Sequence, residues 1–135
     1  MKVKEYNRKK WLMTTYYKLE CIWTNEDENH RCVDTWNDLS EQKLIEHVIE
    51  YLDILHHGNV PYMPELEQVR KNFSQFGEVD EDLINTEYTR LVNGYAAYMA
   101  IMTEIDEYKS DPHCTASSFS VNVDEQTSLS ITAYI

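Results

Sequence analysis

Glycine is scarce in this chain, with 3 residues in 135, where average usage of about 7% would give about nine. Gly58, Gly77 and Gly94 are isolated from one another. Loops that bind phosphate need glycines, because their backbone amides must approach the ligand closely. No GxSxG motif is found either. The sequence therefore argues against nucleotide enzymes and nucleophilic hydrolases, and we expect no catalytic residues and no cofactor.

Cysteine is also rare, and an odd set of 3 does not build the disulfide framework of a small secreted domain. No apolar run approaches the roughly 18 residues that a membrane span needs. The first residues, MKVKEYNRKKWLMTTYY, are basic but lack the apolar core of a signal peptide. We therefore expect a cytoplasmic protein with reduced thiols.

Positive charge is scarce beyond the first residues. Residues 1–18 hold six Lys or Arg against one Glu, a net charge of +5, whereas residues 19–135 hold six against 23 carboxylates, a net charge of −17. The total of −12 speaks about partners and solubility, not about fold. Basic residues 1–10 are expected to form an arm that either is mobile or pairs with the protein's own carboxylates. We expect no direct nucleic-acid binding, because the acidic body would repel a polyanion.

Hydrophobic alternation predicts two antiparallel hairpins, one near each end of the chain. The first has strands at 14–24 and 31–36 around a polar turn at 25–30. The second spans 117–135 with a turn at 124–127, and its apolar residues alternate with Ser, Asn and Thr.

Helical periodicity predicts helices over 40–57, 64–77 and 81–109. Ser40 suits the N-cap of the first helix and Gly58 its end. Apolar residues of the third helix repeat over three heptads between Ile84 and Ile105, which predicts a packing seam. We expect this seam to pack on the helix at 40–57. The alternative is a homodimer through the seam at 84–105.

These elements predict a single α+β domain over residues 1–135. The N- and C-terminal antiparallel hairpins would form a small sheet, packed against about three central helices.

Histidine and cysteine residues offer a possible metal site. Zinc accepts four thiolate and imidazole ligands, and neighbouring hairpins could bring such ligands together. The candidates are Cys21, His30, Cys32, His113 and Cys114. Because their spacing matches no standard zinc motif, we predict no metal and keep these residues only as candidates.

Carboxylates with interspersed aromatics between residues 20 and 53 are the main candidate for function. Such a surface attracts a basic partner and speeds its association, and aromatic residues among charges are typical anchors of interfaces. The predicted partner-binding residues are Glu26, Asp27, Glu28, Asp34, Trp36, Asp38, Glu41, Glu46, Glu50 and Asp53.

The size and charge predict a non-enzymatic inhibitor that covers a basic protein, most simply an immunity-type protein that neutralises a toxin such as a nuclease. A phage anti-defence protein that imitates the charge of DNA is one alternative. A small metal-binding protein or enzyme that uses the His and Cys residues is the other. Only the profile of size and charge supports these classes, because no motif does.

Overall fold

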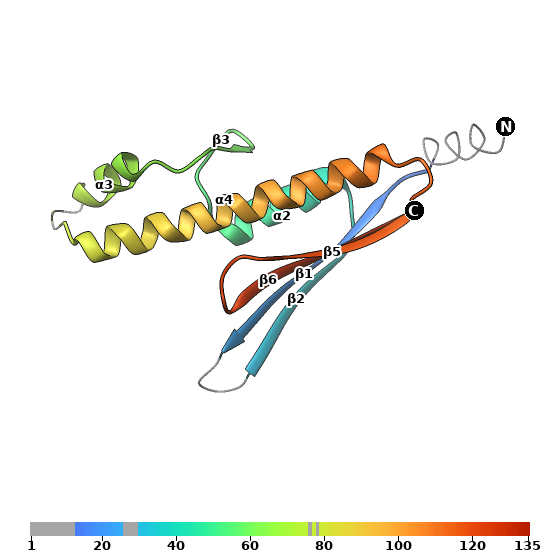
Figure 1. Ribbon diagram of the computed structural model, residues 1–135, viewed down its shortest axis with the longest axis horizontal. Coiled ribbons are helices and arrows are strands. Elements are labelled where there is room, and N and C mark those ends of the chain that lie inside the picture. Colours follow the sequence, from blue (N-terminus) through green and yellow to red (C-terminus); the bar gives the residue numbers. More distant parts are fainter. Residues whose placement is uncertain (1–12, 26–29, 76, 78) are drawn as a thin grey trace.

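Two hairpins that are far apart in the sequence join into one antiparallel sheet (Figure 1). The computed structural model describes residues 13–25, 30–75, 77 and 79–135. Its elements are β1 (Tyr16–Asn25), β2 (His30–Leu39), α2 (Glu41–Leu52), β3 (His56–His57), β4 (Val60–Pro61), α3 (Leu66–Ser74), α4 (Glu81–Ser110), β5 (Ala116–Asn122) and β6 (Thr127–Tyr134). The predicted α+β class is confirmed.

The main sheet has the strand order β2-β1-β6-β5, and every neighbouring pair is antiparallel. Successive side chains of a strand point to opposite faces, so the predicted alternation gives each strand one apolar face. Tyr17, Leu19 and Cys21 of β1 are buried, as are Leu129 and Ile131 of β6. We call this apolar side the inner face of the sheet.

Two helices, α2 and α4, cover the inner face. α2 contacts β1 and β2, while α4 contacts β5. The main core lies between these layers and includes Leu44 and Val48 of α2 and Ile101 and Ile105 of α4. α3 lies against the first half of α4, away from the sheet (Figure 1). The sheet is thus packed against two of the three described helices, whereas the sequence suggested about three.

A second, smaller core forms where α4 extends beyond the sheet. Val69 of α3 packs with Ile84 and Leu91 of α4, and Leu55 and Phe73 are partly buried against them. The described part of the chain therefore has two separate hydrophobic clusters along one 30-residue helix.

The helix predicted over 40–57 ends at Leu52, five residues early. Asp53 takes a left-handed conformation, with φ 48° and ψ 51°, and so stops the helix. His56 and His57 instead form β3, which pairs with β4 across a turn in which Gly58 has φ 65°. The prediction of its start was right, because the Ser40 side chain accepts a hydrogen bond from the Lys43 amide at 3.2 Å.

The other helices follow their predictions more closely. α3 is shorter than the predicted range of 64–77, since Pro64 precedes the helix and Glu65 is its N-cap. α4 begins as predicted at Glu81, and the carboxylate of its N-cap Asp80 accepts hydrogen bonds from the amides of the first turn.

The predicted seam of α4 packs within the chain, but against α3 and the sheet as well as against α2. Ile84 and Leu91 belong to the smaller core, and Tyr98 and Ile105 belong to the main core. A homodimer through residues 84–105 stays a prediction. The predicted arm at residues 1–10 and most of the predicted turn at 25–30 lie outside the described residues.

Candidate partner-binding surface

The residues predicted to bind a partner are distributed over different parts of the fold. Glu26, Asp27 and Glu28 lie outside the described residues. The others lie on β2, on α2, or just after either element: Asp34, Trp36, Asp38, Glu41, Glu46, Glu50 and Asp53. Neighbours in sequence do not share a face here, because a strand alternates its side chains and a helix turns by about 100° per residue.

Asp38 and Glu41 make contacts within the fold. At Asp38, which has φ 55°, β2 contains an extra residue relative to β1. Its amide donates to the Tyr134 hydroxyl at 3.0 Å, and this hydroxyl donates to the Asp38 carboxylate. That second hydrogen bond raises the pKa of Tyr134. Glu41 forms an ion pair of 3.0 Å with Lys109. Both carboxylates therefore help to hold elements together.

Trp36 is half-buried and is used mainly for packing. Its ring stacks on the His47 ring of α2, with a distance of 5.0 Å between centroids and an angle of 28° between planes. It also packs against the main core. Trp36 thus attaches the edge strand β2 to α2 and leaves only part of its ring for a partner.

Three of the predicted carboxylates line one open groove. Glu46, Glu50 and Asp53 recur at helical spacing and so lie on one side of α2. The groove holds about 330 Å³. We call it the α2 groove, and its lining residues are Glu46, Ile49, Glu50, Asp53, Ile54, His56 and Asn59. The β3–β4 hairpin forms its far wall, because β3 supplies His56 and the turn after it supplies Asn59.

The charges of the α2 groove are only partly compensated. A Glu46 oxygen lies 3.2 Å from Lys43 Nζ, and an Asp53 oxygen lies 3.9 Å from Arg90 Nη2. Glu50 has no ion pair in the described part of the chain. The Asp53 side chain is 90% exposed. A cationic side chain could therefore reach these carboxylates while its aliphatic stem lies along Ile49 and Ile54.

Arg90 of α4 determines the shape of this region. Its guanidinium donates to the backbone oxygens of Leu52 and Asp53, each at 3.0 Å, and to the Glu87 carboxylate. A helix leaves its last carbonyls without partners, and a cationic donor there is favourable. Arg90 thus caps α2 from another helix and holds the segment after it in place.

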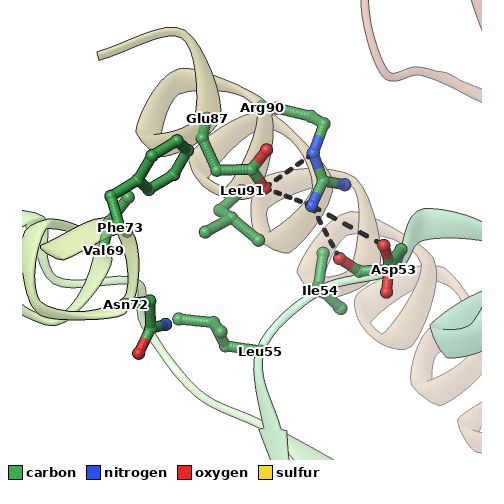
Figure 2. Close-up of a pocket in the computed structure, with 9 residues that line it drawn as sticks. All are labelled: Asp53, Ile54, Leu55, Val69, Asn72, Phe73, Glu87, Arg90 and Leu91. Carbon is green, nitrogen blue, oxygen red and sulfur yellow. Dashed lines mark hydrogen bonds and ion pairs between the residues drawn. The ribbon is translucent and has the colours of Figure 1, made fainter. Parts of the chain in front are cut away.

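A second pocket, of about 280 Å³, lies on the other side of this segment. Figure 2 shows Val69, Asn72 and Phe73 of α3 on one side of this pocket and Leu91 of α4 facing them. Ile54 lies beyond Leu91, beside Asp53, and the Arg90 side chain is directed toward Asp53. Asp53 and Ile54 line both this pocket and the α2 groove. The role of Arg90 could not be predicted from the sequence, because no local pattern links this residue to carbonyls 37 and 38 residues away.

The predicted metal candidates are separated by the fold. At one end of β1, Asn25 pairs with His30 of β2. At the other end of β1, Tyr16 pairs with Tyr134 of β6, which in turn pairs with Ala116 of β5. His113 and Cys114 precede Ala116, so the antiparallel order places them at the opposite end from His30 and Cys32. Among the described residues, no group of three or more His, Cys, Asp or Glu is placed to hold a metal ion.

The cysteines differ in their surroundings. Cys21 is buried, Cys32 is exposed and Cys114 is half-buried, and none forms a disulfide. Burial, with a smaller contribution from Asp34, raises the pKa of the Cys21 thiol to about 12. Because thiolates and not thiols bind metal, Cys21 behaves as a small apolar core residue.

The chain matches no family model, and it is similar to no curated protein and to no solved structure. Among the described residues, no helix has the length and apolar character that crossing a membrane requires.

Proposed function

We propose that this protein is a non-enzymatic inhibitor that binds a basic protein through the α2 groove. The observation that carries the proposal is the alignment of Glu46, Glu50 and Asp53 in one open groove with apolar Ile49 and Ile54. Lysine and arginine side chains fit such a groove, because each combines an aliphatic stem with a charged end.

A toxin that acts on nucleic acid is the partner class that we favour. Proteins that bind nucleic acid need Lys and Arg to neutralise phosphates. An acidic protein that occupies those cations would prevent substrate binding without any catalytic group of its own. The net charge of −12 supports this immunity-type role, because it speeds the encounter with a basic protein.

The test uses the basic protein that this chain captures from a low-salt extract. We expect association to slow at least about tenfold when salt rises from roughly 50 to 300 mM, because screening weakens the attraction between exposed charges. At low salt, the double variant Glu46→Lys with Glu50→Lys should associate more slowly than the wild type. It should keep the fold intact, since Glu50 is exposed and Glu46 is only partly buried.

The matched control is Asp106→Lys with Glu107→Lys, which makes the same change in net charge on exposed positions near the end of α4. A general effect of net charge would slow both double variants equally. Equal slowing, or an association rate that does not depend on salt, would contradict a role for the α2 groove.

A further inference from the structure

The inner face of the sheet continues beyond the helices that cover it. Along β1, Leu19 and Cys21 are 0% and 2% exposed, whereas Trp23, the next residue on this face, is 39% exposed. Figure 1 shows the β1–β2 end of the sheet extending past α2 and α4. An indole ring therefore lies on a part of the inner face that the helices leave uncovered.

The strand register places a carboxylate beside this ring on the same face. Cys21 pairs with Asp34 on β2 and with Leu129 on β6. Trp23, one step further along β1, pairs with Cys32 and Thr127. Paired residues share a face, so Asp34 and Trp23 occupy neighbouring rows of the inner face.

Tyr51 approaches these rows from the last turn of α2. It is half-buried against the main core. Burial raises the pKa of its hydroxyl, and the nearby Cys21, Asp34 and Asp124 raise it further. Asp34 comes from β2 and Asp124 from the turn between β5 and β6, so the phenol lies near carboxylates contributed by two different hairpins.

The two carboxylates are available to different degrees. Asp34 is exposed and forms no ion pair in the described part of the chain. One oxygen of Asp124 accepts hydrogen bonds from the amides of Gln126 and Thr127, at 2.8 and 2.7 Å, which fixes the turn. Asp34 is therefore the principal anionic group near Trp23 and Tyr51, and Asp124 is a second carboxylate whose position the turn fixes.

We propose that Trp23, Asp34, Tyr51 and Asp124, the Trp23 site, receive one arginine side chain of the basic partner. This inference rests on the proposed function and names the chemistry of a second contact outside the α2 groove. A guanidinium stacks on an indole face while it donates hydrogen bonds to a carboxylate. Arginine fits better than lysine, because its planar, weakly hydrated group makes both contacts at once.

The site is tested on the full chain by nuclear magnetic resonance, with an amidated tri-arginine peptide as the probe and tri-lysine as its comparison. We expect tri-arginine to shift the Trp23 indole N–H signal saturably, with the Trp36 signal unchanged, and tri-lysine to shift it much less. Replacing Trp23 by Phe identifies its signal. Asp34→Asn should weaken binding of the tri-arginine peptide by about fivefold. The control Glu125→Gln removes the same charge on the turn that contains Asp124 and should leave peptide binding unchanged.

A Trp23 signal that does not move would overturn the inference. So would equal shifts with both peptides, or equal weakening by Asp34→Asn and Glu125→Gln. These outcomes are distinct from failure of the proposed function. If the peptide binds at Trp23 but partner association does not depend on Glu46 and Glu50, the α2 groove is wrong and the arginine site stands. If the reverse holds, only the arginine site is wrong.

Discussion

At the scale of single residues, Arg90 connects three parts of the molecule. It lies on α4, caps the last carbonyls of α2, lines the pocket of Figure 2 and pairs with Asp53, which also lines the α2 groove. Its side chain is 42% exposed, so the ion pair with Asp53 at 3.9 Å contributes little. The hydrogen bonds to the backbone oxygens of Leu52 and Asp53 carry most of its effect, because they satisfy groups that the helix end leaves without partners.

We therefore predict that Arg90→Gln lowers the free energy of unfolding by about 1.5–3 kcal/mol, the usual range for hydrogen bonds to a charged group. Urea unfolding followed by circular dichroism measures the change. Arg31→Gln on the exposed side of β2 is the control and should stay within about 0.5 kcal/mol. A similarly small change for Arg90→Gln would mean that the cap does not stabilise α2.

Gly94 is a second residue whose role depends on a close contact. A Cβ added there would lie 2.5 Å from Ile54 Cγ2. Alanine normally stabilises a helix interior by about 1 kcal/mol relative to glycine, but overpacking a core costs about 1–3 kcal/mol. We predict that Gly94→Ala destabilises the wild type and stabilises an Ile54→Ala variant. A double-mutant cycle measured by urea unfolding checks this, and equal effects in both backgrounds would refute the contact.

At the scale of elements, β1 brings titratable groups into the core. Burial, followed by Glu41 and Tyr108, raises the pKa of Tyr17 to about 12 from 10.0. Cys21 is raised to about 12 from 9.0. Both groups are neutral when protonated, so the folded state holds its protons more tightly than the unfolded state does. Their contribution to stability is complete below pH 9 and is lost as pH rises toward 12.

We predict that the free energy of unfolding falls between pH 9 and 12, and that Tyr17→Phe reduces the part of this fall above pH 10. Urea unfolding at a series of pH values measures both. Tyr16→Phe removes a hydroxyl from the exposed face of the same strand and should leave the wild-type profile unchanged. If Tyr17→Phe behaves like Tyr16→Phe, the Tyr17 hydroxyl does not govern this alkaline loss.

At the scale of the whole molecule, two hydrophobic clusters of unequal size share one long helix. The main cluster contains buried residues from β1, β6, α2 and α4, whereas the smaller one has three buried residues, Val69, Ile84 and Leu91. Local opening is easiest where few apolar contacts resist it. The α3 region should therefore open without unfolding of the sheet.

We predict that the amides of α3 and of the first turns of α4 exchange hydrogen faster than those of β1 and β6. Val69→Ala should accelerate exchange in α3, because it removes about 1–3 kcal/mol from the smaller cluster, and should leave β1 and β6 unchanged. Ile131→Ala, in the main core, should accelerate exchange in β1 and β6. Uniform acceleration by Val69→Ala would show that the two clusters unfold as one unit.

Local residue patterns were enough to predict the α+β class, the two hairpins, the start of α2 at Ser40 and nearly the whole of α4. These features are encoded by residues close together in the chain, through alternation, helical spacing and capping side chains. The tertiary structure alone decided that α2 ends at Leu52, because Arg90 and the left-handed Asp53 act there. It also brings Glu46, Glu50 and Asp53 together in one groove. Asp38 and Glu41 instead make contacts within the fold. His113 and Cys114 lie at the far end of the sheet from His30 and Cys32. Such outcomes depend on which distant residues meet, and local periodicity contains no information about those contacts.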